Sequence, residues 1–315
     1  VIGFTTNAIT HSLYKKRKER MNNKDKIIRK IGNIVLNLFY YGFIVVFCFI
    51  LLRVFVFGSY KIPTNSMEPA IIPGDYVLVN KLAYGARLFD LFAAVEGKKV
   101  KIKRVPGLTS IKNNDLVVFH IPYPGPTGKI DMDMSKYFIK RCIGVPGDTL
   151  RIINGVYSVN WDTLKQLGNY PEQLALNGKP EEAFPEGVYH TFPWDSILGW
   201  NIKDFGPLYI PRKGDRVTLH GTNALLYKKI IEWEKGRSLS LENDSLSDMG
   251  KSLREHVFTH DYYFMGGDKV ENSQDSRYWG LLPDDLIVGK ASLVWKSIDP
   301  YSNSFRWDRC MKRIN

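Results

Sequence analysis

The chain has 315 residues, of which 44% are hydrophobic and 24% charged, and its formal net charge is +12. These proportions are ordinary for a globular protein and argue against a chain that is disordered throughout. The length suffices for one large or two modest domains. The six histidines form no H-E-x-x-H motif, so we expect neither a metal nor a cofactor.

The positive charge is concentrated near the N-terminus. Residues 15–30 contain nine Lys or Arg and two acids, a net charge of +7 that leaves +5 for the other 299 residues. Such a run can bind nucleic acid, but its position beside an apolar segment favours a membrane-topology signal, and we expect no nucleic-acid partner. Because Met21 opens a natural-looking tail, we expect residues 1–20 to be a non-native or misannotated start. Residues 21–30 alone still carry +3.

A long apolar segment follows this basic run. Ile34–Leu52 is 19 residues with one clearly polar member, Asn37, and the apolar character resumes at Val54–Phe57. Such a helix is about 28 Å long, close to the ~30 Å hydrocarbon core of a bilayer. A buried core helix is rarely apolar on all faces, and a cleavable signal peptide has a shorter apolar run and a small-residue cleavage site. We therefore predict a transmembrane helix over residues 31–56, with residues 1–30 as a basic cytoplasmic tail.

After this helix the pattern is strand and turn, which predicts a mostly β fold. Asn154-Gly155 predicts a hairpin turn, and residues 223–233 predict a helix capped by Asn223. We expect one β domain from residues 57–149 and 258–315, with a second β-rich lobe inserted at 150–257. The predicted strands are Tyr76–Val79, Leu116–Ile121, Tyr137–Ile143, Tyr262–Met265 and Leu286–Trp295, and the helix should bury Ala224, Tyr227, Ile230 and Ile231.

Two residues suggest nucleophilic chemistry. Ser66 lies in a turn bracketed by Pro63 and Pro69, and a serine hydroxyl needs a base to become a good nucleophile. Lys140 lies in an apolar strand, where alternation puts it on the same face as Phe138 and Cys142. Burial lowers the pKa of a lysine, so Lys140 can serve as the base. Taken singly, each residue has an ordinary reading: a structural serine in a turn, and a lysine that snorkels to the surface.

A third block, the polar loop Gly267-Asp-Lys-Val-Glu-Asn-Ser-Gln-Asp-Ser-Arg277, completes a specific pattern. The apolar segment, the Ser66 turn, the Lys140 strand and this loop, in this order, resemble bacterial signal peptidase I. That family consists of membrane-bound serine proteases that remove secretory signal peptides with a Ser-Lys pair. The resemblance runs from about Arg53 to Arg309 and is weakest between Asn160 and Gly206.

The resemblance implies a role for each matching residue. Ser66 would be the nucleophile and Lys140 the general base, and the Thr64 hydroxyl and the Ser66 backbone N–H would form the oxyanion hole. Ser273 would hydrogen-bond and orient the lysine amine. The residues implied as structural support of the loop are Gly267, Asp268, Asp275 and Arg277.

The resemblance also implies the substrate, the partners and the location. Signal peptides would bind as an added strand, with small residues at positions −1 and −3 in shallow apolar pockets. The pocket residues would be Ile62, Met67, Ile71, Phe138 and Ile139, each of which also fits plain core packing. The partners would be secretory precursors and membrane phospholipid, at the inner (plasma) membrane, with a single-pass anchor and the catalytic domain on the periplasmic side. No oligomeric state is implied.

The chain departs from the family in one place. The box usually written Gly-Asp-Asn-Arg-Asp-Asn-Ser reads Gly267-Asp-Lys-Val-Glu-Asn-Ser273, which adds Lys269 and loses the arginine. We expect Lys269 to point to solvent. This change supports an alternative function, a catalytically impaired paralogue that binds precursors or the export machinery. A related self-cleaving repressor would carry a DNA-binding domain where this chain has its apolar helix.

Overall fold

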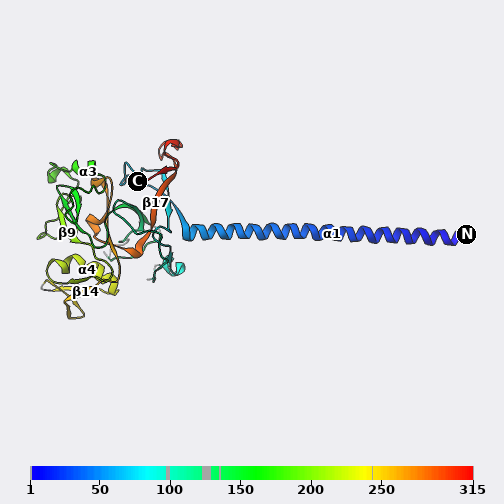
Figure 1. Ribbon diagram of the computed structural model, residues 1–315, viewed down its shortest axis with the longest axis horizontal. Coiled ribbons are helices and arrows are strands. Elements are labelled where there is room, and N and C mark those ends of the chain that lie inside the picture. The colour runs from blue at the N-terminus through cyan, green and yellow to red at the C-terminus, as the bar shows by residue number, and fades with distance from the viewer. Residues whose placement is uncertain (1, 97–99, 123–128, 135, 243, 315) are drawn as a thin grey trace. The chain divides into compact units, whose positions relative to one another are not determined.

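The computed structural model describes residues 2–96, 100–122, 129–134, 136–242 and 244–314, and the chain divides into two compact units between Val54 and Phe55. The first unit is helix α1 (Ile2–Leu51), which Figure 1 shows as one uninterrupted ribbon. A π-helical turn, Leu52–Val56, continues it. Among the described residues, one helical segment, Lys24–Val56, is long and apolar enough to cross a membrane, and the predicted span falls within it.

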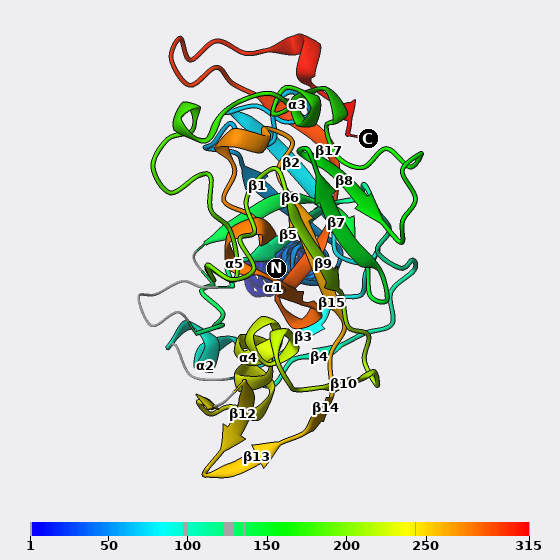
Figure 2. The same ribbon diagram turned by 90° about the vertical axis from the view of Figure 1, so that its left-hand side faces the viewer.

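The second unit is mostly β (Figure 2). Its largest sheet runs in the order β1-β2-β17-β5-β6-β15-β16, with β18 beside β17. Neighbouring strands in it are antiparallel. Side chains alternate along β2, where Val77 and Val79 are fully buried, as period-2 patterning requires. The bounds are β1 (Phe57–Lys61), β2 (Asp75–Asn80), β5 (Leu116–His120), β6 (Tyr137–Gly144), β15 (Tyr262–Gly266), β16 (Leu282–Pro283), β17 (Ile287–Ser297) and β18 (Lys312–Arg313).

This sheet curls, so that strands distant in its order approach each other. Strand β1 stands at one end of the order and β6 in its interior, yet the rings of Tyr60 and Tyr137 are 4.7 Å apart between centroids. Twist and coiling of this kind are normal for antiparallel sheets. The curl brings the chain that follows β1 next to the middle of β6.

Residues 149–257 contribute no described strand to this sheet. They form smaller sheets and the longest helix of this unit, α4 (Thr222–Lys235). The strands are β7 (Thr149–Ile153), β8 (Val156–Val159), β9 (Phe205–Tyr209), β10 (Arg216–Thr218), β11 (Ser240–Glu242), β12 (Ser245–Asp248), β13 (Lys251–Leu253) and β14 (Glu255–Val257). The remaining short elements of the unit are β3 (Arg87–Leu88), β4 (Lys103–Arg104), α2 (Leu91–Val95), α3 (Tyr170–Leu174) and α5 (Ser276–Trp279), with 3-10 turns at Glu181–Ala183, Val270–Asn272, Asp284–Leu286 and Trp307–Arg309.

The inserted residues share their core with the main sheet. Leu150, Phe205 and Ile230 belong to the same buried cluster as Phe119 and Phe264 of the sheet. The rings of Phe205 and Phe264 are 5.5 Å apart between centroids. The predicted lobe is therefore not a compact unit of its own.

Two local predictions can be compared directly with the structure. Asn154 and Gly155 have φ values of 49° and 85°, the left-handed pair that a tight hairpin requires, so the predicted turn is confirmed. Helix α4 buries the predicted face. The predicted cap is wrong: the helix begins after Gly221, and the Asn223 side chain, inside the first turn, donates to the Thr218 carbonyl instead of accepting from a helix N–H.

Candidate active site

The turn that carries Ser66 is fixed at both of its ends. It leaves β1 at Ile62, whose N–H donates to the Asp75 carbonyl at 2.8 Å, and Gly74 donates back to the Ile62 carbonyl at 2.9 Å. The fully buried Asp75 carboxylate accepts from Arg309 at 3.0 and 2.6 Å. Charge-assisted bidentate pairs of this kind are among the strongest hydrogen bonds in proteins, so the turn has a firm base.

Strand β6 places Lys140 against this turn. Lys140 pairs across the sheet with Val117 of β5, and its Nζ atom lies 2.5 Å from the Oγ atom of Ser66. Ser66 is 9% exposed and Lys140 3% exposed. The structure thus brings together the two residues that the sequence predicts as nucleophile and base.

The surroundings favour the neutral form of the lysine. Burial lowers the pKa of Lys140 to about 8, against the opposing charges of Asp275 and Asp268 and with the help of Arg277. Each of these acids is paired with an arginine of its own. Both nearby carboxylates are thus ion-paired with arginines and do not pair with the Lys140 amine alone. The amine can therefore lose its proton near neutral pH.

Asp275 and Arg277 form the first of these pairs, and both side chains are wholly buried. Arg277 donates to the Asp275 carboxylate from Nε at 2.8 Å and from Nη2 at 2.7 Å. Burial alone would raise the pKa of Asp275, but the charge and hydrogen bonds of Arg277 and the charge of Lys140 hold it below its usual value. Arg277 also donates to the Val270 carbonyl at 2.8 Å, and the Gly267 N–H donates to Asp275 at 2.9 Å. This pair thus braces the whole polar loop.

Arg141 and Asp268 form the second pair, which sequence reasoning missed. Arg141 donates to the two carboxylate oxygens of Asp268 at 2.7 Å each. The signal in the sequence was a basic residue, Arg141, in the strand of Lys140 and an acidic residue, Asp268, in the polar loop. The pair ties the strand of the lysine to the polar loop.

The polar loop also binds the turn that carries Ser66. The Lys269 N–H donates to the Ser66 carbonyl at 3.1 Å, and Asn272 Nδ2 donates to Asn65 Oδ1 at 3.0 Å. Lys269 Nζ lies 3.0 Å from Glu68 Oε2, and its side chain is 35% exposed. The expectation that Lys269 simply points to solvent is therefore wrong, because Glu68 supplies a counter-charge on the facing turn.

Ser273 and Thr64 occupy different surroundings. Ser273 is 7% exposed, and its Oγ has no hydrogen-bond partner among the described residues, so the expected bond to the lysine amine is not made in this structure. This hydroxyl packs against Gly267, 2.0 Å from where a Cβ of that glycine would stand. Thr64 is exposed, open to an approaching ligand.

The five residues expected in substrate pockets differ in burial. Phe138 and Ile139 are half-buried, on strand β6 beside Lys140. Ile62 and Met67 are 7% and 2% exposed, and Ile71 has no exposed surface. All three belong to the buried cluster under β2, and Ile139 packs against it. In this structure Ile71 is a core residue, which reaches a ligand only if its neighbours move.

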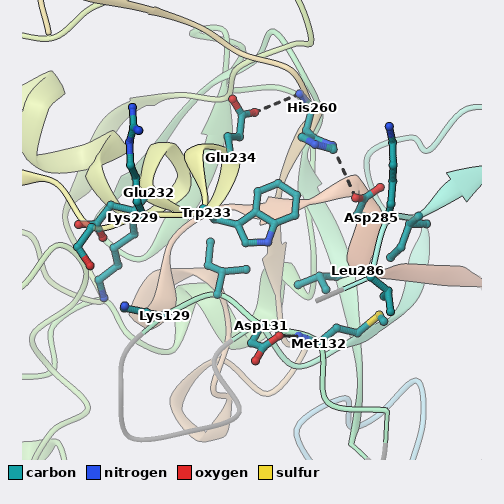
Figure 3. Close-up of a pocket in the computed structure, with 17 residues that line it drawn as sticks. Lys129, Asp131, Met132, Lys229, Glu232, Trp233, Glu234, His260, Asp285 and Leu286 are labelled. Atoms are coloured by element: carbon teal, nitrogen blue, oxygen red, sulfur yellow. Dashed lines mark hydrogen bonds and ion pairs between the residues drawn. The ribbon is translucent and has the colours of Figure 1, made fainter. Parts of the chain in front are cut away.

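A separate cavity of about 710 Å³ lies beside α4, with Trp233, Glu234, His260 and Asp285 in its walls (Figure 3). None of the predicted site residues lines it.

Within its walls, His260 Nδ1 lies 3.0 Å from Asp284 and 4.0 Å from Asp285. Burial would lower the pKa of His260, but the hydrogen bond to Asp284 and the charges of both aspartates raise it overall. The three side chains lie close enough to hold a metal ion, and the raised pKa also suits an ion pair between His260 and the two aspartates.

Known proteins are similar to this chain over most of its length. The model of the family described as "Signal peptidase, peptidase S26" matches residues 35–296. Signal peptidase I of Buchnera aphidicola subsp. Schizaphis graminum is 26% identical over 277 residues, which cover 85% of this chain and 77% of the relative. Signal peptidase I of Pseudomonas aeruginosa is 29% identical over 265 residues, 81% and 70% of the two chains. Signal peptidase I of Aquifex aeolicus is 28% identical over 259 residues, 81% and 82%. Since the matched stretch covers most of its length, the chain belongs to the signal peptidase family of serine proteases.

Proposed function

We propose that this chain is a membrane-anchored endopeptidase that removes signal peptides from exported precursors, with Ser66 as nucleophile and Lys140 as general base. The observation that carries the proposal is the 2.5 Å contact between Lys140 Nζ and Ser66 Oγ in a site where the pKa of the lysine is lowered to about 8. A neutral amine at that distance is within reach of the hydroxyl proton.

Acylation starts with the neutral amine. As the Ser66 Oγ attacks the carbonyl carbon of the scissile bond, the amine of Lys140 takes the hydroxyl proton. The negative charge that develops on the carbonyl oxygen is stabilised by the Ser66 backbone N–H and the Thr64 hydroxyl. The resulting ammonium then protonates the leaving amine, which is the N-terminus of the mature protein.

Deacylation reuses the same base. Lys140, again neutral, takes a proton from a water molecule that attacks the ester carbonyl on Ser66. The tetrahedral intermediate collapses, the proton returns to Oγ, and the carboxylate of the signal peptide leaves. Every proton in the cycle passes through one amine, so the two steps share one pH dependence.

The substrate would bind as an extra strand. Strand β1 stands at one end of the sheet order, and an edge strand is a template for adding a peptide strand. The curl of the sheet puts β1 near Tyr137, so a peptide on this edge passes the half-buried Phe138 and Ile139. Phe138 and Ile139, with Ile62 and Met67 beneath them, would leave only shallow apolar pockets. Such pockets fit small substrate residues at −1 and −3.

The topology follows from the charge beside the helix. Residues 21–30 alone carry a net charge of +3, and such residues remain cytoplasmic by the positive-inside rule, so residues 57–315 lie across the membrane, where exported precursors emerge. Protease added to intact spheroplasts should digest the region after Phe57. Protection of that region would contradict this topology.

The experiment for the function is a cleavage assay in membrane vesicles with a purified secretory precursor. The full chain should release the mature protein, and Ser66→Ala should release almost none while binding the precursor normally. Processing by folded Ser66→Ala protein would exclude Ser66 as nucleophile. Binding without cleavage by the unaltered chain would favour the alternative, an inactive paralogue.

A further inference from the structure

The polar loop holds the nucleophile turn on both sides of Ser66. Asn272 binds the side chain of Asn65, the Lys269 N–H binds the carbonyl of Ser66 itself, and the Lys269 ammonium binds the carboxylate of Glu68. The three contacts thus reach the residue before the nucleophile, the nucleophile, and the second residue after it. Two of them come from one residue, Lys269.

The loop can hold the turn because it is itself anchored. The Val270 carbonyl accepts from the buried Arg277, and the Val270 side chain is 1% exposed. It packs in a cluster of its own with Leu176, Phe184 and Ile202 of the inserted residues. On the outer side, Glu271 forms an ion pair with Lys179 of the same insertion. A shift of the loop would disturb all of these contacts.

We propose that the Lys269–Glu68 ion pair is a positioning device that holds the Ser66 turn at the distance proton transfer to Lys140 requires. This inference rests on the proposed function. Misplacing a reacting group by about 1 Å can slow a reaction on the order of 10²-fold, so a restraint on the turn acts on the chemical step. Neither Lys269 nor Glu68 touches the reacting atoms, and both act through the backbone of the turn.

The same geometry separates this role from tuning of the base. The charged groups that act on the pKa of Lys140 are Asp275, Arg277 and Asp268. The charge of Lys269 is neutralised by Glu68. The Lys269 side chain is 35% exposed, so solvent screens its charge as well. Removing the pair should change the rate constant and leave the pKa of the base in place.

The test measures precursor cleavage by four forms of the full chain in vesicles: unaltered, Glu68→Gln, Lys269→Met, and the exchange Glu68→Lys with Lys269→Glu. A partly exposed ion pair is worth up to about 1 kcal/mol, so each single variant should lower kcat about threefold to fivefold. The KM and the pH midpoint should stay unchanged. The exchange should recover at least half of the lost rate, which a merely structural residue would not do.

The matched control is Glu255→Gln. Glu255 forms an exposed ion pair with Arg216 between β10 and β14, away from the polar loop, and its loss should leave kcat unchanged. Raising the salt concentration should slow the unaltered chain and Glu255→Gln more than the single variants, since salt screens an intact pair.

The outcomes distinguish this inference from the proposed function. If the unaltered chain cleaves and Ser66→Ala does not, the function stands whatever the other variants do. The positioning role is then overturned if Glu68→Gln and Lys269→Met keep full kcat, or if the exchange recovers nothing. It is also overturned if Lys269→Met moves the pH midpoint by a unit or more, because that result makes Lys269 a tuner of the base.

Discussion

The Nζ atom of Lys140 lies 2.5 Å from the Oγ atom of Ser66, although 74 positions separate the two residues in the chain. The contact depends on the curl that brings the end of β1 to the middle of β6. The use of this contact for proton transfer also depends on burial, since an exposed lysine at the same distance would stay charged and could not accept a proton.

The rate of cleavage should rise with pH and then level off. The pKa of Lys140 is lowered to about 8, and only the neutral amine is a base, so kcat/KM should rise about tenfold per pH unit below that value. Above pH 8 it should reach a plateau. Steady-state cleavage from pH 6 to 10 checks this, and a rate that is flat between pH 6 and 8 with chemistry limiting would remove Lys140 as the base.

Replacing Lys140 should stabilise the fold. The pKa of Lys140 falls from 10.5 to about 8 on burial, so the charged form destabilises the native state at pH 7 by roughly 3 kcal/mol. Between pH 8 and 10.5 the unfolded chain holds a proton that the native chain has lost, and the stability of the unaltered chain therefore rises with pH.

Lys140→Met should thus unfold at a higher urea concentration at pH 7, and its advantage should shrink towards pH 10.5. Urea titration of the chain in detergent measures this. Lys312→Met, an exposed lysine of β18, is the control and should change little. A Lys140→Met chain that is less stable than the unaltered one at pH 7 would contradict the burial argument.

Gly267 should be intolerant of a side chain. A Cβ there would lie 2.0 Å from the Ser273 hydroxyl and 2.9 Å from the Ser66 carbonyl oxygen, so the loop or the turn must move. Gly267→Ala should lower kcat at least about tenfold, given the sensitivity of rate to placement. Gly42→Ala adds the same methyl group where nothing lies within 4 Å and should cleave normally in the same assay. Full activity of Gly267→Ala would indicate that the loop does not fix the turn.

Thr64 should act through its hydroxyl alone. It is exposed two residues before Ser66, and an oxyanion donor is worth on the order of 10²-fold in kcat. Thr64→Val keeps the shape and should lose this factor with little change in KM, whereas Thr64→Ser should keep most of the rate. Single-turnover kinetics separates binding from chemistry, and equal rates for the two variants would assign the oxyanion contact elsewhere.

What could be predicted from the sequence was local or periodic. The face that Lys140 shares with Phe138, the Asn154-Gly155 turn and the buried face of α4 each depend on neighbouring residues. The partner of Lys269 could not be predicted this way, because Glu68 is 201 positions away and the pair depends on how two loops meet. The Asn223 cap failed for a related reason, since Gly221 and the Thr218 carbonyl decide where the first turn begins.

The packing of Val270 against Leu176, Phe184 and Ile202 bears on how parts of this chain can be exchanged with its relatives. Val270 stands where the family usually has an arginine, and its surroundings come from the stretch of the chain that matches the family least. An arginine restored there would be buried among apolar side chains, which costs free energy unless its charge is paired. The polar loop and residues 176–202 therefore form one transferable module. A chimera that moves either segment alone should fold poorly, and one that moves both together should retain a working loop.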